Sequence, residues 1–328
     1  MRICTFSLAG EARVGVLFGE KIADLKLAYA LSLDEESAAE AMDRVEAEIP
    51  DDCEEFIEDL ELNRPLAEEA LEALEAHESK KDPIRFDGMQ VIYEPEEVEI
   101  LPPVVPDTLF CMARNYVAHA AEMARTKVDD FKEELPLYCF LKPSTSVSGP
   151  YDDVPVYTSM EKLDYELELG VLIGQGGKNI PVERAMDHVG GYTLFNDMSD
   201  RTTLNMGKFI DWYSMKAPDG FAPIGPYILL PDEGLDPHDL RLKLWVNGEL
   251  RQDATTGDMV WRIAEQISYL SGVATLRTGD IIGTGSPAGN AASWGEYLQP
   301  DDLIEGEIEG IGRQAFRIKS EDPEYTPG

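Results

Sequence analysis

The 328-residue sequence is poor in basic residues and in cysteine, and each scarcity argues against a class of protein. Its 28 lysines and arginines stand against 64 acidic residues, which gives a formal net charge of −36 at pH 7. A field of that sign repels polyanions, so we expect no nucleic-acid partner and no binding to an anionic membrane surface. The four cysteines include no Cys-x-x-Cys pair, which argues against a structural zinc site.

Long apolar runs are also missing from the sequence. No stretch reaches the length of a bilayer span, and the first residues, MRICTFSLAGEARVG, have too short an apolar region and too early a charge for a signal peptide. We therefore expect a soluble, cytoplasmic protein. The acid is spread along the chain, as in DFKEEL and EGEIEG, and dispersed acid keeps a protein soluble in strong salt. We expect a halophilic source; an ordinary acidic cytosolic protein is the alternative.

The patterning of apolar residues changes along the chain. Residues 1–30 alternate in the manner of β-hairpins, and residues 35–80 switch to helical spacing. The proline-rich stretch VEILPPVVPD reads as a linker, and short strands dominate from residue 99 to about 320. This order favours a β-rich core with peripheral helices over a doubly wound sheet.

One helix is expected among these strands, over 256–271, with Thr256 as its cap and apolar residues at helical spacing. The fold class we predict is a β-rich α+β protein with a small N-terminal α+β domain. The predicted divisions are an N-terminal domain over 1–98, a catalytic domain over 99–322 and a tail over 323–328.

The stretch KLDYELELGVLIG, residues 162–174, places an acidic pair at the start of an apolar strand. Glu166 and Glu168 are two residues apart, so on a strand they face the same side, with roots about 6–7 Å apart. A hard divalent cation would remove the repulsion between the two carboxylates. Asp197, at the end of the strand GYTLFND, is the expected third oxygen ligand. The alternative is a solvated strand face.

A second candidate site lies in RNYVAHAAEM, residues 114–123. His119 and Glu122 are three residues apart, hence neighbours on one helical turn. Glu122 can accept a hydrogen bond from one ring nitrogen of His119 and leave the other free to take a proton from water, as in a general-base pair. Two alternatives remain: a chance surface pair in an acidic chain, or two further metal ligands.

Two lysines and a glycine-rich turn complete the set of candidates. Lys216 in SMKAPDGFAPIGP and Lys142 in FLKPS either face a substrate carboxylate or a developing enolate, or are snorkelling side chains. The turn GTGSPAG lacks the ending of a nucleotide P-loop, but its amides and the Thr284 hydroxyl would suit a small carboxylate if it is more than a tight turn. We assign Arg114, Lys142 and Thr284 to substrate binding.

Seven stretches in this order resemble the fumarylacetoacetate hydrolase (FAH) superfamily, with its acylpyruvases and 2-hydroxyhepta-2,4-diene-1,7-dioate isomerases. They are ARNYVAHAAEM, FLKPSTSVSGP, DYELELGVLIG, GGYTLFNDMSDR, KAPDGFAPIGP, VNGELRQD and GDIIGTGSPAG. The resemblance covers about residues 99–320. It implies a mixed β-sandwich roll, usually in a homodimer, and a divalent cation, commonly Mg²⁺ or Mn²⁺ and sometimes Ca²⁺.

The resemblance also implies roles for individual residues and a lid over 123–135. The implied roles are metal ligation by Glu166, Glu168 and Asp197, water activation by His119 and Glu122, charge stabilisation by Lys216 and carboxylate contact by Thr284. Three carboxylates around one divalent ion leave a charge of minus one, so a nearby cation is needed beside an anionic substrate.

The chemistry implied is that of a 2-oxo acid, which would chelate the cation through its carboxylate and oxo oxygens. We expect hydrolysis of a carbon–carbon bond of a 2,4-dioxo acid such as an acylpyruvate, through a metal-bound enolate. Decarboxylation of oxaloacetate, or an isomerase or hydratase step on an unsaturated 2-oxo diacid, is the alternative at the same site. An alternative of another class is a non-catalytic binding protein stabilised by its metal.

Overall fold

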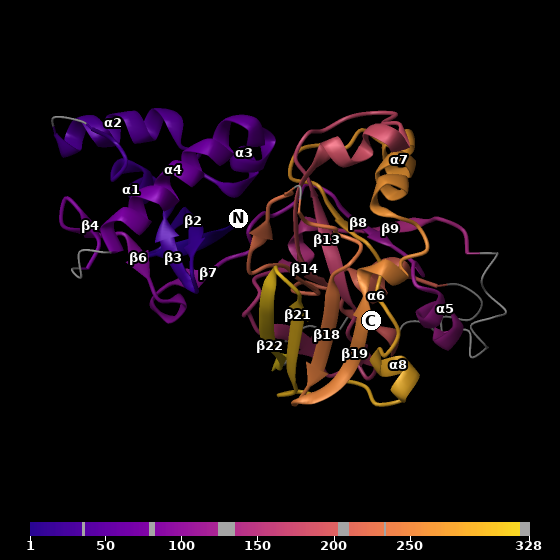
Figure 1. Ribbon diagram of the computed structural model, residues 1–328. Helices are drawn as coiled ribbons and strands as arrows, with labels where there is room; N and C mark the ends of the chain where they lie inside the picture. Colours follow the sequence, from indigo (N-terminus) through magenta and orange to yellow (C-terminus); the bar gives the residue numbers. More distant parts are fainter. Residues whose placement is uncertain (35–36, 79–82, 124–134, 203–209, 233, 322–328) are drawn as a thin grey trace.

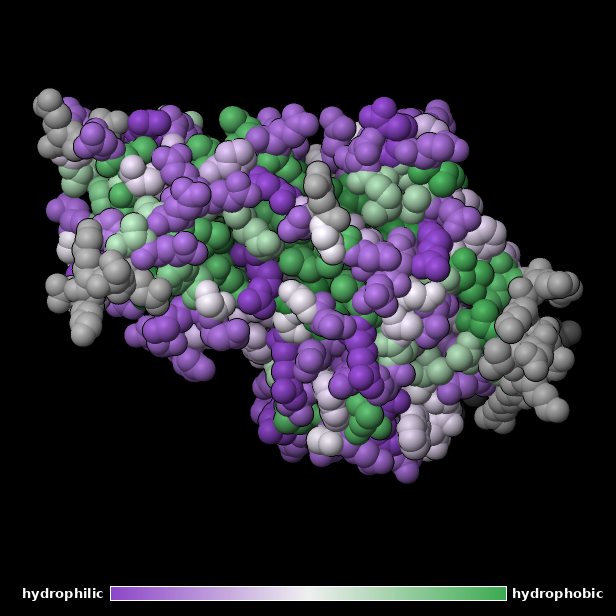
Figure 2. Space-filling model, in the orientation of Figure 1, coloured by the Kyte–Doolittle hydropathy of each residue, from purple (hydrophilic) through white to green (hydrophobic). Residues whose placement is uncertain are grey.

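A computed structural model describes residues 1–34, 37–78, 83–123, 135–202, 210–232 and 234–321 (Figure 1). The expected tail over 323–328 and nearly all of the expected lid over 123–135 lie outside the described residues. Hydrophilic side chains cover much of the face drawn in Figure 2, with apolar side chains showing between them. The described helices include none that is long and apolar enough to cross a membrane.

The N-terminal part is a small antiparallel sheet with helices against it, at the left of Figure 1. Its first three strands form consecutive hairpins, as the alternation predicts, and the first turn contains Gly10 at φ +87°, a conformation that glycine adopts without strain. The strands are β1 (Arg2–Leu8), β2 (Glu11–Phe18), β3 (Lys21–Asp24), β4 (Arg85–Phe86), β5 (Met89–Gln90), β6 (Ile92–Tyr93) and β7 (Glu99–Ile100).

Helices fill the region between β3 and β4, and the expected helical region is confirmed. They are α1 (Leu25–Ala30), α2 (Ala38–Glu48), α3 (Cys53–Glu58) and α4 (Leu60–Glu78). Helix α1 falls within the segment expected to be hairpin. Asp24 caps it by accepting a hydrogen bond from the Leu27 amide, and nearly all of its residues are buried, so it lacks the polar face that reveals a helix in sequence.

One long sheet joins the N-terminal part to the rest of the chain, because β1 pairs antiparallel with β17, Arg2 lying opposite Leu229. The order along the sheet is β6-β3-β2-β1-β17-β14-β13-β20-β8-β9, with β7 also on β1. The domain boundary near residue 98 stays a prediction. The strands added are β8 (Leu109–Met112), β9 (Cys139–Lys142), β13 (Leu167–Ile173), β14 (Val189–Asn196), β17 (Ile228–Leu229) and β20 (Ile281–Gly283).

A second sheet of five strands packs against β13 and β14, and the main core lies between the two sheets. Its order is β11 (Val154–Tyr157), β22 (Gly312–Glu321), β21 (Leu303–Ile308), β18 (Arg241–Val246) and β19 (Glu249–Thr255). Strands β13 and β14 are buried along their whole length. The β-rich α+β class is therefore confirmed. The shortest strands are β10 (Val147–Ser148), β12 (Leu163–Asp164), β15 (Ser199–Asp200) and β16 (Ala222–Pro223).

The helix expected over 256–271 begins later than predicted. Residues Thr256–Asp258 form a 3-10 turn, and the helix itself, α7, covers Ile263–Val273. The Thr256 hydroxyl accepts a hydrogen bond from the Leu240 amide at 2.9 Å, so it does not cap α7. The remaining helices are α5 (Val117–Met123), α6 (Trp212–Lys216) and α8 (Ala291–Trp294).

Candidate metal centre

The three predicted carboxylates converge where β13 begins and β14 ends. Leu167 of β13 lies opposite Asn196 of β14. Glu166 and Glu168 are the neighbours of Leu167, and Asp197 follows Asn196, so the three acidic residues meet at this end of the strand pair. Ligand atoms of the three carboxylates all lie within 4.8 Å of one another. The three residues are at most 6% exposed. The period of the strand and its antiparallel partner thus produce the cluster.

Glycine makes room for Glu168. A Cβ atom on Gly283 of β20 would lie 2.5 Å from the Phe195 ring and 2.7 Å from Glu168 Oε2. The same Oε2 accepts a hydrogen bond from the Gly285 amide at 2.9 Å. Burial raises the pKa of Glu168 well above its usual range, and the nearby Asp197 and Glu166 carboxylates add to the shift. A cation at this point would relieve that unfavourable charge.

Two buried lysines hold Asp197. Lys216 Nζ lies 2.5 Å from Asp197 Oδ2 and 2.6 Å from Glu166 Oε2. Lys142 Nζ lies 2.6 Å from the other oxygen, Asp197 Oδ1. Burial acts to lower the pKa of both lysines. At Lys142 this effect prevails, and the pKa is lowered. At Lys216 the Asp197 and Glu166 carboxylates outweigh burial, and the pKa is raised.

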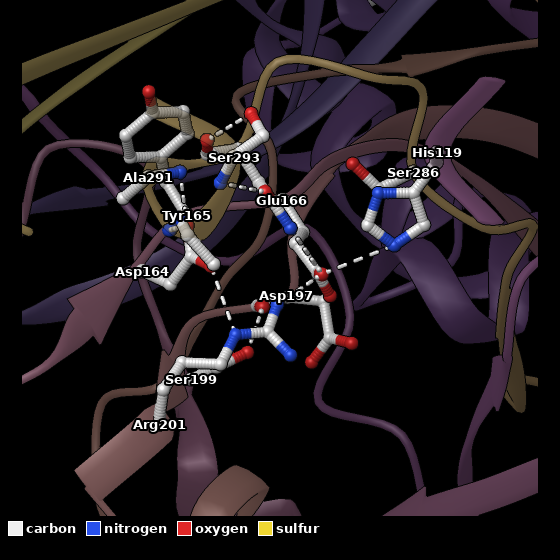
Figure 3. A network of polar contacts seen from close by, with 12 residues as sticks. His119, Asp164, Tyr165, Glu166, Asp197, Ser199, Arg201, Ser286, Ala291 and Ser293 are labelled. Carbon is white, nitrogen blue, oxygen red and sulfur yellow. Dashed lines mark hydrogen bonds and ion pairs between the residues drawn. The ribbon is translucent and has the colours of Figure 1, made fainter. Parts of the chain in front are cut away.

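Arg201 belongs to the same network and was missed by the sequence analysis (Figure 3). Its Nε lies 2.8 Å from Asp164 Oδ2, and its Nη2 lies 2.5 Å from Glu166 Oε1. Asp164 in turn accepts a hydrogen bond from the Ala291 amide at the start of α8. The sequence signal was its place at the end of GGYTLFNDMSDR, four residues after Asp197.

Buried basic side chains offset most of the negative charge of the carboxylates in the cluster. Four buried acids meet three buried bases, so the fully ionised cluster carries minus one, and a divalent ion would bring it to plus one. A site of that sign suits an anionic ligand. The acids are Asp164, Glu166, Glu168 and Asp197, and the bases are Lys142, Arg201 and Lys216.

His119 lies on α5 with its Nε2 3.6 Å from Glu166 Oε1 (Figure 3). Its Nδ1 is buried and has no hydrogen-bond partner among the described residues. Burial lowers the pKa of His119 to about 4, although Glu166 acts in the opposite direction. The expected hydrogen bond from His119 to Glu122 is not made, because Glu122 Oε2 accepts from the Gly289 amide at 3.0 Å instead.

A cavity opens onto the cluster, and only one of the three predicted substrate-binding residues lines it. Arg114 lines the cavity and is exposed. Thr284 does not line it: its hydroxyl donates to the Leu169 carbonyl at 2.9 Å, while Ser286 of the same turn reaches the cavity. Lys142 does not line it either. The apolar lining consists of Met112, Ala113, Phe140, Ile210, Trp212 and Met215.

The donor set fits a hard divalent cation. Three carboxylates offer oxygen ligands, as such an ion prefers, while the cluster holds no thiolate and its one imidazole approaches Glu166. The orphaned Nδ1 of His119 adds a group that a bound molecule can satisfy. On a β-rich double-sheet scaffold, these features define a candidate metal-assisted catalytic centre.

Comparison with known proteins identifies the family. A family model described as fumarylacetoacetate (FAA) hydrolase C-terminal matches residues 108–319. The chain therefore belongs to the fumarylacetoacetate hydrolase family. An uncharacterized protein of Staphylococcus saprophyticus is 39% identical over 220 residues, which cover 66% of this chain and 70% of that protein. Another, of Pyrococcus horikoshii, is 38% identical over 221 residues, with 67% and 91% covered.

Solved structures confirm the expected FAH-type fold. A fumarylacetoacetate hydrolase from Exiguobacterium antarcticum is 28% identical with a TM-score of 0.73, over 98% of this chain and 100% of that one. A maleylpyruvate hydrolase from a Sphingobium species, solved in complex with manganese(II) ion and pyruvate, is 29% identical with a TM-score of 0.70, over 98% and 99%.

Proposed function

We propose that the protein is a divalent-metal-dependent hydrolase that cleaves a carbon–carbon bond of a 2,4-dioxo acid of the acylpyruvate type. The observation that carries this proposal is the cluster of Glu166, Glu168 and Asp197, buried within 4.8 Å of one another beside His119 at one cavity. The 29% identical hydrolase solved with manganese(II) ion and pyruvate supports it, because pyruvate is itself a 2-oxo acid.

Glu166, Glu168 and Asp197 are the residues that would hold the ion, with Mg²⁺ or Mn²⁺ as the first candidates and Ca²⁺ as the third. When bound there, such an ion supplies a Lewis acid for the oxygens of a 2-oxo acid. Lys216 lines the cavity beside two of these carboxylates, so its ammonium group can offset negative charge that develops on the substrate.

His119 is the proposed general base. Because its pKa is lowered to about 4, the ring is neutral at pH 7 and can accept a proton. We assign the acceptance to Nδ1, which has no hydrogen-bond partner in the described part of the chain. The water deprotonated there would attack the distal carbonyl, and the electron pair of the broken carbon–carbon bond would leave with the 2-oxo fragment as an enolate. The proton held at Nδ1 would then pass to the enolate carbon. The products are then a carboxylic acid and pyruvate.

Outside the cluster, we propose that Arg114 and Ser286 contact the substrate, since both line the cavity. Glu122, whose carboxylate accepts a hydrogen bond from the Gly289 amide, is assigned to orienting the turn that carries Ser286. We also propose that the protein is cytoplasmic and that it forms a homodimer. Size-exclusion chromatography with light scattering at molar salt would test the homodimer.

The deciding experiment is turnover of acetylpyruvate by protein stripped with EDTA, before and after addition of Mn²⁺ or Mg²⁺. We expect hydrolysis only with metal. His119→Ala should lower kcat by about 10²–10⁴-fold, the usual contribution of a general base, while Mn²⁺ still binds. His77→Ala is the matched control, because His77 lies on α4 and its one hydrogen bond to a described residue goes to the Ala73 carbonyl of its own helix. Undiminished turnover by His119→Ala would contradict the assigned base.

The same protein distinguishes the other functions by product. Release of CO₂ from oxaloacetate would identify a decarboxylase, and an ultraviolet change on an unsaturated 2-oxo diacid without fragmentation would identify an isomerase or hydratase. Hydrolysis is favoured because two family members more than 25% identical to this chain are hydrolases. A non-catalytic protein would lose thermal stability on chelation and turn over none of these compounds.

A further inference from the structure

Lys142 occupies a position that its expected contact with substrate does not explain. Its side chain is 0% exposed, and its Nζ bonds to Asp197 Oδ1 at 2.6 Å and to the Met198 carbonyl at 3.0 Å. It is not among the residues that line the cavity, whereas Lys216, which holds the other oxygen of Asp197, is. The two lysines therefore face Asp197 from different surroundings.

The contact joins distant strands of the long sheet. Lys142 ends β9, the edge strand, and four inter-strand steps separate β9 from β14, which precedes Asp197. In a flat sheet those steps would amount to about 19 Å, well beyond the reach of a lysine side chain. The sheet must curl for the 2.6 Å contact to form. The bond thus fixes the end of β14 relative to the far edge.

Asp197 needs such a partner, because it lies beyond the last residue of β14 and its carboxylate is not held by the strand itself. Lys142 removes the freedom of the Asp197 side chain to rotate by bonding to one oxygen. Its ammonium group also lies 6.0 Å from the centre of the Phe195 ring, the ring that takes the space left by Gly283. The same packing thereby supports Asp197 and Glu168.

We propose that Lys142 is a positioning residue that holds the metal ligand Asp197 in its binding orientation and does not contact the substrate. The proposal rests on the proposed function in requiring that Asp197 bind a metal ion. Outer partners of metal ligands fix the ligand orientation, and removing one costs about 10–100-fold in metal affinity.

A positioning role and a simple effect of charge predict opposite changes in Mn²⁺ affinity when Lys142 is replaced. A lysine that supplied only positive charge would repel a divalent ion, so Lys142→Met would tighten Mn²⁺ binding. A lysine that positions Asp197 makes the same change weaken binding. A lysine that contacts substrate would instead raise KM and leave the affinity for Mn²⁺ unaltered.

The test is the Kd for Mn²⁺, measured by calorimetry on full-length protein well below its Tm, with KM for acetylpyruvate at saturating Mn²⁺. We expect Lys142→Met to raise the Kd about 10–100-fold and to leave KM within about threefold. The control is Lys178→Met, which should leave both values unchanged, because Lys178 is exposed and bonds, within the segments that the structure describes, only to the Gly272 carbonyl. If Lys142→Met does not fold, Lys142→Gln is measured in its place.

An unchanged or lower Kd in Lys142→Met would overturn the positioning role, and a raised KM with unchanged Kd would restore the substrate contact. If the wild-type protein binds no Mn²⁺, the metal centre of the proposed function fails together with this inference. If the wild type binds Mn²⁺ and hydrolyses acetylpyruvate while the variant binds equally well, only the role of Lys142 is wrong.

Discussion

Replacing Arg201 with methionine should strongly destabilise the protein. Arg201 lies between Asp164 and Glu166, and the three side chains are at most 7% exposed. Glu166 keeps Lys216 as a partner, but among the described residues Asp164 has no other ion pair. The substitution therefore leaves a buried carboxylate supported only by amide hydrogen bonds.

The expected cost follows from the burial of the pair. Removing one partner of a buried ion pair costs about 3–5 kcal/mol. For a chain of this size, about 2 °C of Tm per kcal/mol predicts a fall of roughly 6–10 °C. Calorimetric scans at fixed protein, salt and metal concentration provide the measurement. Arg241→Met is the matched control: Arg241 makes two bonds to Asp253, at 2.8 and 2.7 Å, but at the surface, where solvent screens the pair.

A second substitution tests the cause. Adding Asp164→Asn to Arg201→Met removes the stranded charge, so the double variant should melt above the single Arg201→Met variant. If Arg201→Met melts at the same temperature as Arg241→Met, the buried pair contributes no measurable stability and the argument fails.

Four further outcomes are expected. Gly283→Ala should cost about 1–3 kcal/mol and weaken Mn²⁺ binding, because its Cβ would overlap Phe195 and Glu168, whereas Gly272→Ala, with open space around it, should not; equal unfolding midpoints in urea would contradict this. Thr284→Val should lower stability by about 1 kcal/mol without raising KM, since its hydroxyl bonds to a carbonyl; a large rise in KM would restore its role in substrate binding. Mn²⁺ at 100 times its Kd should add about 2.7 kcal/mol to the free energy of unfolding, and no shift of Tm on chelation would count against the metal centre. Tm should rise between low and molar KCl if the net charge of −36 reflects a halophilic source, and a flat or falling Tm would argue for an ordinary acidic protein.

The carboxylate cluster could be predicted because it depends on local rules. The two-residue period puts Glu166 and Glu168 on one side of a strand, and Asp197 directly follows the next buried strand. The network around them could not be predicted in this way. Arg201 reaches Asp164 because β12 pairs with β15, Leu163 lying opposite Asp200, and nothing in either short stretch encodes that partner.

Hydrogen-bond partners were the weakest part of the prediction. Helical spacing correctly made His119 and Glu122 neighbours on α5 but could not show that the Gly289 amide competes for Glu122. The glycine-rich turn was found, yet which of its residues lines the cavity depends on the backbone, and it is Ser286 rather than Thr284. A sequence gives the residues near a site more readily than the atoms they bond to.

The pairing of β1 with β17 makes the family-matching segment a poor unit for dissection. A fragment cut to residues 108–319 would lack β1, the strand that pairs with β17. The buried residue Ile228 would then lie on an unpaired edge strand, which could pair with other molecules. Leu109 and Leu172 would also become more exposed to solvent, because they belong to the same hydrophobic core as Ile3 and Val16. Grafting, truncation or chimera building on this scaffold should therefore carry the first strands along.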